Sequence, residues 1–248
     1  MRKTTSLFVA LVAALALAVP ASAVQFGHPD GNDHPYVGVL AFWDSDFNFI
    51  NRRCTGTLIS PTKVLTAAHC TFDATYAMVF FDEVVSAPVG GVPGLAHTEP
   101  RFDGFASFPA SYDLAVVTLL FPVTTIAHAT LAPVGYLDTL RKGSHTSFDI
   151  VGYGVQDLKA GIAARARHAG EARIVNIESS NLGGYNVRLT GAPGTGGAAC
   201  FGDSGGPVLH GTTVVAVQSL GKDHCVGGSL GYRTDTADSL AFINSFAP

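Results

Sequence analysis

The most constraining feature of this sequence is a succession of short runs rich in β-branched and aromatic residues, separated by Gly, Pro, Asn and Asp. The runs cover residues 37–43, 63–66, 78–81, 115–120, 150–155, 172–177, 185–189 and 213–220. No long stretch with the apolar spacing of a helix interrupts them. Many short strands with regular turn signals predict an antiparallel sandwich or barrel.

The C-terminal tail is the one good helical candidate. Asp238 is positioned to cap a helix, and Leu240, Ile243 and Phe246 then fall on one face. The segment 121–133 contains prolines and no charged residue, so we expect it to cross between two halves of similar size.

The first 23 residues have the three-part pattern of a secretory signal peptide. Arg2 and Lys3 supply positive charge, an apolar run follows over residues 7–19, and Ala23 ends a small-residue cleavage site. A membrane-spanning helix needs about 20 apolar residues, and this run is shorter. We therefore expect residues 1–23 to be removed, a secreted mature chain of residues 24–248, and no membrane span after signal removal.

Composition excludes two broad classes. Hydrophobic residues make up 47% of the chain and charged residues 14%. A chain of this kind can bury a sizeable core, and it lacks the charge density of a disordered or nucleic-acid-coating protein. We expect no nucleic-acid partner.

The four cysteines all lie in the predicted mature chain, and an exported protein meets an oxidising compartment. Four cysteines allow three pairings. The pairing Cys54–Cys70 with Cys200–Cys225 is favoured because each bridge closes a short loop. A zinc site is the rival interpretation, but no CxxC or HExxH spacing occurs, so we expect no metal.

Three segments carry candidate reactive side chains. His69 stands beside Cys70 at the end of an apolar run, Asp113 precedes another apolar run, and Ser204 is followed by Gly205 and Gly206. Each segment alone also fits an ordinary structural role, since a buried His, a strand-start Asp and a Gly-rich turn are common. Together, in the order His, Asp, Ser within a secreted all-β chain, they indicate nucleophilic catalysis.

The strings TAAHC, YDLAVV and CFGDSGGPV resemble those of the chymotrypsin-like (trypsin-fold) serine peptidases. This resemblance implies an all-β fold of two antiparallel Greek-key β-barrels packed face to face, with a C-terminal helix. We expect the N-terminal barrel at about 34–121, the C-terminal barrel at about 134–236 and the helix at about 238–246.

The resemblance also implies roles for individual residues. His69, Asp113 and Ser204 would form the catalytic triad, and the N–H groups of Gly202 and Ser204 would form the oxyanion hole. Ser219 matches a family position that contacts the catalytic Asp. We therefore expect a monomeric secreted serine endopeptidase that acts on polypeptides, has proteinaceous inhibitors as further partners, and needs no cofactor.

The resemblance places a substrate pocket beside the nucleophile. Its residues would be Ala198, Ala199, Ser219, Gly221 and Leu230, with Ser229 as the alternative to Leu230. None of them is acidic, and a buried guanidinium without a partner would be costly. We expect apolar rather than basic residues before the scissile bond.

The predicted mature N-terminus departs from the usual family arrangement, in which a cut after a basic residue frees the terminus. No Lys or Arg occurs between Ala23 and Arg52, so that cut has no site. Signal cleavage would itself expose Val24, and the resemblance implies an ion pair between the Val24 ammonium and Asp203. The alternative is an unattached N-terminus.

Two other function classes remain open. The residues around Ser204 also satisfy the GxSxG pattern of α/β-hydrolases, which would make the chain a secreted esterase. That fold needs alternating helices and strands, which the sequence lacks. A catalytically inactive relative that acts as a binding protein is the second alternative, although such relatives usually lose a triad member.

Overall fold

The computed structural model describes residues 24, 27–87, 89–140, 146–157, 162–163, 166–177, 179–190, 197–221, 225 and 228–246. The predicted signal peptide, residues 1–23, lies outside the described residues.

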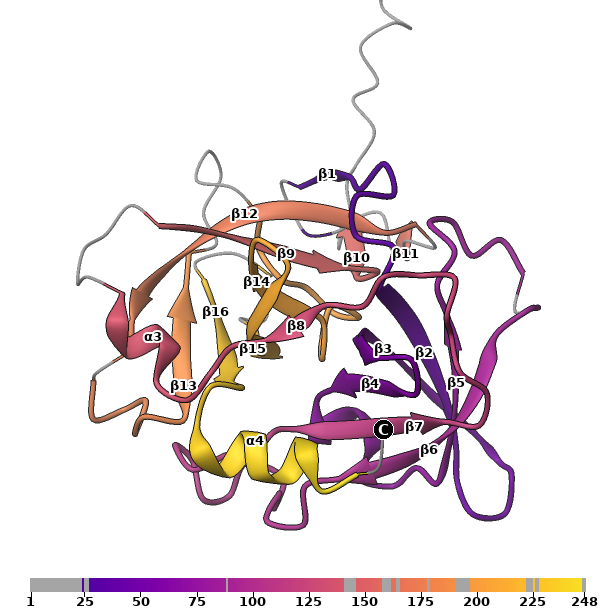
Figure 1. Cartoon of the computed structure of the whole chain (residues 1–248), viewed down its shortest axis with the longest axis horizontal. Helices are drawn as coiled ribbons and strands as arrows, with labels where there is room; N and C mark the ends of the chain where they lie inside the picture. Colours follow the sequence, from indigo (N-terminus) through magenta and orange to yellow (C-terminus); the bar gives the residue numbers. More distant parts are fainter. Residues whose placement is uncertain are drawn as a thin grey trace, which may run out of the picture.

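The first half of the chain forms a closed antiparallel barrel (Figure 1). Its strands are β2 (Val37–Trp43), β3 (Phe49–Ser60), β4 (Lys63–Thr66), β5 (Tyr76–Phe80), β6 (Val92–Thr98) and β7 (Ala115–Leu119). They pair in the order β2-β3-β4-β7-β6-β5. Alternate residues point inward, and side chains such as Leu40, Leu58 and Val117 are fully buried in the core.

The second half forms another antiparallel barrel, which closes through pairing of β12 with β9. Its strands are β9 (Ser147–Gly152), β12 (His168–Asn176), β13 (Asn186–Leu189), β14 (Pro207–His210), β15 (Thr213–Leu220) and β16 (Ser229–Arg233). Short strands extend it or stand beside it: β1 (His28–Pro29), β8 (Thr130–Leu131), β10 (Val155–Asp157) and β11 (Ile162–Ala163). The all-β class with two barrels is confirmed.

Helices are short in the part of the chain that the structure describes. They are α2 (Ala68–Thr71), α3 (Tyr136–Thr139) and the C-terminal α4 (Ala237–Asn244). None of them is long and apolar enough to cross a membrane.

The C-terminal helix is present, but its capping residue differs from the prediction. Thr236 has an extended backbone, and its hydroxyl accepts the Ser239 N–H over 3.1 Å. The Asp238 carboxylate lies inside the first turn and pairs with Arg101 Nη1 at 2.7 Å. Asp238 is therefore a first-turn residue rather than the cap.

A fully buried arginine joins the two barrels to the N-terminal segment. Arg167 donates from Nε to Asp30 Oδ2 over 2.7 Å. Its Nη1 donates to the carbonyls of Val37 at 2.9 Å and Phe81 at 3.1 Å, both in the first half of the chain. The same Nη1 donates to the Tyr153 hydroxyl at 3.1 Å, in the second half. The guanidinium charge is therefore paired and hydrogen-bonded, as burial requires.

Candidate active site

His69 and Asp113 meet where β4 and β7 end side by side. The two strands pair from Lys63↔Thr118 to Thr66↔Ala115, which places α2 beside Asp113, two residues before β7. The fully buried Asp113 carboxylate accepts the His69 backbone N–H at 2.8 Å. Its Oδ2 lies 2.8 Å from His69 Nδ1. The imidazole is thus oriented with Nδ1 toward the carboxylate, and Nε2 is the nitrogen left for proton transfer elsewhere.

Ser219 contacts the same carboxylate from the second barrel. Its hydroxyl donates to Asp113 Oδ2 over 2.5 Å. A buried carboxylate is costly unless donors surround it. Asp113 accepts two hydrogen bonds from His69 and one from Ser219. Ser219 therefore lies where the resemblance expected a partner of the Asp.

Ser204 follows a tight loop that begins at Cys200, and it lines one cavity together with His69. The cavity has a volume of about 280 Å³. Its other lining residues are Ala199, Cys200, Phe201, Gln218, Ser219, Leu220, Gly221 and Cys225. The structure therefore brings the predicted nucleophile and base to a single hollow, together with part of the predicted pocket.

The pocket prediction is only partly matched by this hollow. Ala199, Ser219 and Gly221 line it, whereas Ala198 and Leu230 are absent from its described lining. Ala198 is buried, and Leu230 pairs with Leu220 between β16 and β15.

Gln218 also lines this hollow, and sequence reasoning did not propose it as a pocket residue. Its side chain is buried, and its Oε1 accepts the Ser229 hydroxyl at 3.2 Å. In the sequence, Gln218 is marked only by its position next to Ser219. The amide brings a polar group to the pocket without adding a charge.

Two backbone N–H groups in the Ser204 loop differ from their neighbours. The neighbouring N–H groups donate to backbone carbonyls, as seen at Asp203, Gly205 and Gly206. Within the residues that the structure describes, the N–H groups of Gly202 and Ser204 have no acceptor. Gly202 has φ +100°, a backbone conformation that favours glycine. The loop thus holds two donors available to a bound group.

Thr55 holds this loop from the first barrel, and sequence reasoning did not identify it. The Thr55 N–H donates to the Ser204 carbonyl and its hydroxyl donates to the Gly202 carbonyl, each over 2.8 Å. The hydroxyl also accepts the Tyr153 N–H at 3.1 Å. One fully buried residue therefore holds the carbonyl before Asp203 with its side chain and the carbonyl of Ser204 with its backbone.

The side chain of Asp203, which belongs to the same loop, is buried. Its two carboxylate oxygens accept the N–H groups of Gly154 and Cys200, each at 2.8 Å. A Cβ at Gly154 would lie 2.5 Å from the carboxylate, so glycine is needed there. Burial raises the pKa of Asp203 to about 7, although both N–H groups and the charge of Arg53 act in the opposite direction.

Val24 is buried in the core of the second barrel, where its side chain packs against Gly170 and Gly197. Among the described residues, no hydrogen bond joins Val24 to Asp203. The structure contains the chain before any cleavage, in which the Val24 nitrogen is an amide.

Both disulfides join cysteines close in sequence, Cys54 to Cys70 and Cys200 to Cys225. His69 lies near the first bridge, and a ring nitrogen and the two sulfur atoms are within 4.8 Å of one another. Because these sulfur atoms are bonded to each other, they do not provide thiolate ligands for a metal.

A model of the family described as Trypsin matches residues 25–243. The chain belongs to the trypsin family. Trypsin from Saccharopolyspora erythraea is 30% identical over 212 residues, which cover 79% of this chain and 86% of that relative. Brachyurin from Leptuca pugilator is 30% identical over 215 residues, which cover 81% of this chain and 86% of the relative.

The trypsin-family fold is also evident from a solved structure. A structure of HL collagenase superposes with a TM-score of 0.71 at 19% identity, covering 92% of this chain and 100% of the other. Membership of the trypsin family makes the chain a serine-type endopeptidase, a hydrolase with polypeptide substrates.

Proposed function

We propose that the chain is a secreted endopeptidase in which Ser204, His69 and Asp113 form the catalytic triad. The observation that carries this proposal is the Asp113–His69 hydrogen bond at 2.8 Å, together with the cavity that His69 shares with Ser204. The predicted signal sequence and the two disulfides support export to an oxidising compartment.

The proposed chemistry depends on proton transfers between Ser204, His69 and the leaving amine. A serine hydroxyl is a poor nucleophile at neutral pH, so His69 takes the Ser204 proton as the hydroxyl oxygen attacks the peptide carbonyl carbon. His69 then returns that proton to the leaving amine, and the C–N bond breaks. Water attacks the resulting acyl-enzyme by the same route and regenerates Ser204. Asp113 holds the imidazole orientation throughout and stabilises its charged form.

The carbonyl oxygen becomes negatively charged in the tetrahedral intermediate. The N–H groups of Gly202 and Ser204 are the proposed donors to it, and they have no acceptor among the described residues. Removing one such donor costs about 3 kcal/mol of transition-state stabilisation. Thr55 supports this arrangement because it fixes the carbonyls of Gly202 and Ser204.

The proposed substrate preference is for apolar residues before the scissile bond. No described residue lining the cavity beside Ser204 carries a carboxylate. An Arg or Lys side chain entering it would lose its hydration without gaining an ion pair. Small residues at Ala199 and Gly221 leave space for an apolar side chain.

The proposed activation step is signal removal. Cleavage after Ala23 would give Val24 an ammonium group, and this ammonium would pair with the Asp203 carboxylate. The burial of both residues supports the proposal, since a buried carboxylate with a raised pKa gains most from a cationic partner.

Covalent labelling tests the proposed triad. The mature protein is treated with a serine-reactive fluorophosphonate, and peptide hydrolysis is measured in parallel. We expect labelling of the native protein at Ser204 and none of the folded Ser204→Ala variant. Peptide hydrolysis by Ser204→Ala should be slower by several orders of magnitude, and adding His69→Ala should cost little more because triad members act as a unit. A folded native protein without labelling would instead support the inactive binding relative.

A further inference from the structure

The backbone around Asp113 has an unusual conformation. The Leu114 N–H donates to the Tyr112 carbonyl at 2.8 Å, which makes Asp113 the central residue of a three-residue turn. Tyr112 has φ +44°, in the left-handed region that a residue with a large side chain rarely adopts. The direction of the buried Asp113 carboxylate therefore depends on an unfavourable backbone conformation at the residue before it.

One end of this turn is fixed by the first barrel. The Leu114 carbonyl accepts the Glu99 N–H at 3.0 Å, and the Leu114 side chain is buried. Glu99 directly follows β6, so the sheet holds the turn at its Leu114 end. The Tyr112 end depends instead on the contacts of the Tyr112 ring.

The Tyr112 ring contacts a cation and a second ring. The Arg101 guanidinium lies over it, at 4.1 Å from the ring centroid. Tyr185, from the second half of the chain, meets it edge to face, with centroids 5.4 Å apart and ring planes at 66°. Both kinds of contact are attractive. They stabilise the position of the ring and so counteract the cost of the left-handed backbone.

Arg101 is itself held by two carboxylates from separate parts of the chain. Its Nε donates to Glu99 Oε1 at 2.8 Å, and its Nη1 donates to Asp238 Oδ2 at 2.7 Å. Glu99 is buried, and Asp238 belongs to the C-terminal helix α4. Two charge-assisted hydrogen bonds therefore fix the plane of the guanidinium over the Tyr112 ring.

We propose that Tyr112 is a positioning residue for Asp113, and that Arg101 holds it there. This inference rests on the proposed function, in which Asp113 orients His69. Arg101 keeps the Tyr112 ring in place, the ring keeps the left-handed backbone, and that backbone directs the carboxylate. Strained residues persist where surrounding contacts hold them, and they gather at active sites.

The test uses the mature protein, a p-nitroanilide substrate with an apolar residue before the scissile bond, and three variants at one position. Tyr112→Phe keeps the ring, Tyr112→Asn loses the ring but tolerates a left-handed backbone, and Tyr112→Ala does neither. We expect native kcat in Tyr112→Phe, a fall of about tenfold in Tyr112→Ala and a smaller fall in Tyr112→Asn. KM should change little, because Tyr112 acts through Asp113.

The comparison of Asn with Ala separates positioning from a general structural role of the ring, since both variants lose it. Equal kcat in Tyr112→Asn and Tyr112→Ala would overturn the proposal. No p-nitroanilide hydrolysis by the native protein would count against the proposed function itself. Hydrolysis by the native protein, with an unchanged kcat in Tyr112→Ala, would overturn the positioning role alone.

Arg101→Gln tests the second link and leaves Tyr112 intact, so it serves even where Tyr112→Ala does not fold. It removes the charge over the ring and both ion pairs, and we expect kcat to fall about threefold. The same substitution made in Tyr112→Asn should have no further effect, because Arg101 acts through the ring. A threefold fall in that double variant, or an unchanged kcat in Arg101→Gln, would contradict the role of Arg101.

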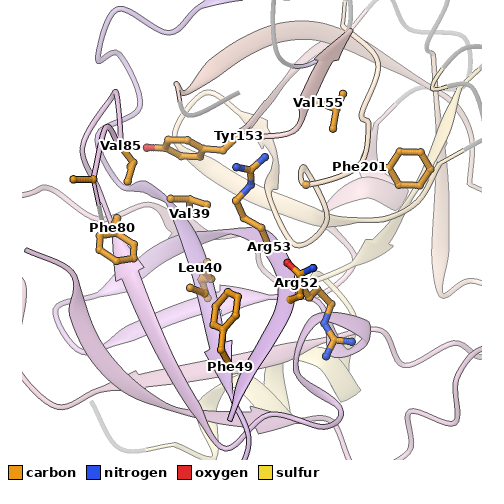
Figure 2. Close-up of a pocket in the computed structure, with 14 residues that line it drawn as sticks. Val39, Leu40, Phe49, Arg52, Arg53, Phe80, Val85, Tyr153, Val155 and Phe201 are labelled. Atoms are coloured by element: carbon orange, nitrogen blue, oxygen red, sulfur yellow. The ribbon is translucent and has the colours of Figure 1, made fainter. Parts of the chain in front are cut away.

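Phe49→Ala is the matched control, because it also removes a ring from the first barrel. Phe49 is 58% exposed, and its ring meets that of Trp43 with centroids 5.5 Å apart. Figure 2 shows it in the wall of a cavity of about 570 Å³, whose described lining includes neither Asp113 nor His69. We expect native kcat and KM on the p-nitroanilide. A tenfold fall in kcat here too would mean that any lost ring disturbs the site, and the proposal would fail.

Discussion

The hydroxyl of Ser219 on β15 lies 2.5 Å from Asp113 Oδ2, so a hydrogen bond from the second barrel reaches the carboxylate that orients His69 in the first. Both His69 and Asp113 belong to the first barrel, and the second barrel adds a donor to the carboxylate they share. This third donor is present only when the two barrels pack together.

Loss of the hydrogen bond from Ser219 to Asp113 should lower the turnover rate more than it weakens substrate binding. In Ser219→Ala, Asp113 loses a donor while His69 keeps both of its contacts, so we expect kcat to fall about tenfold with KM little changed. Steady-state kinetics on one apolar peptide measure the split. Ser229→Ala is the control, because its hydroxyl donates to the neutral Gln218 amide. A rise in KM at constant kcat would mean that Ser219 only shapes the pocket.

Thr55 provides a second contact across the barrels. Thr55→Val keeps the side-chain shape but leaves the Gly202 carbonyl and the Tyr153 N–H without their partner, which should cost about 1–3 kcal/mol of unfolding free energy. We expect the rate of fluorophosphonate labelling to fall about tenfold because the oxyanion donors lose their fixed position. Thr55→Ser retains the hydroxyl and should restore most of the rate. Equal labelling by all three proteins would argue against a positioning role.

Specificity before the scissile bond can be measured with chromogenic peptides that differ only at that residue. Peptides with Leu, Phe or Ala should be hydrolysed faster than the Arg peptide, because the described lining of the cavity offers no carboxylate to a guanidinium. The comparison is made as kcat/KM under one set of conditions. Faster hydrolysis of the Arg peptide would contradict the proposed preference.

Activation can be tested by placing one extra residue ahead of Val24. This form has no ammonium at Val24, so we expect a folded protein with little turnover, whereas the form beginning at Val24 should be fully active. Full activity with the added residue still attached would contradict the ion pair between Val24 and Asp203.

The pH dependence of stability distinguishes the same two forms. With the extra residue, burial holds the pKa of Asp203 at about 7, above its ordinary value of 3.8. The unfolded chain then binds fewer protons between about pH 4 and 7, so the free energy of unfolding should fall as pH rises through that window. Asp203→Asn should remove this fall. Denaturant titrations at several pH values provide the measurement.

The form beginning at Val24 should behave differently at alkaline pH. A free α-amino group has a pKa of about 7.7–8.0, and pairing with Asp203 raises it in the folded state. The stabilisation is then complete below that range and is lost as pH rises through the higher folded pKa, together with activity.

The barrels and the segments around His69, Asp113 and Ser204 could be predicted because their signals are local. Short β-branched runs mark the strands, and each candidate catalytic residue stands inside a specific string of neighbours. Thr55 carries no such signal, since its partner Gly202 is 147 residues away and the contact exists only once two barrels meet. Gln218 is similar, because a strand residue does not reveal which cavity it faces.

For the C-terminal helix, the sequence predicted the element but not its capping residue. Its apolar spacing predicted the element, but the cap depends on which polar residue has an extended backbone, and that residue is Thr236. Asp238 instead pairs with Arg101, 137 residues earlier. Local preference identified the helix, and a long-range ion pair decided the role of its acidic residue.

The Arg167 hydrogen bonds have a consequence for the movement of the molecule. The guanidinium is held by Asp30, by two carbonyls of the first half and by Tyr153 of the second, and it has no exposed surface. A hinge rotation that separated the barrels would strip partners from a buried charge, which costs several kcal/mol. The cavity that His69 shares with Ser204 therefore does not widen by such a rotation, and we expect a substrate segment to unfold and extend before it enters. Flexible loops and chain ends of target proteins should be cut well before their folded cores.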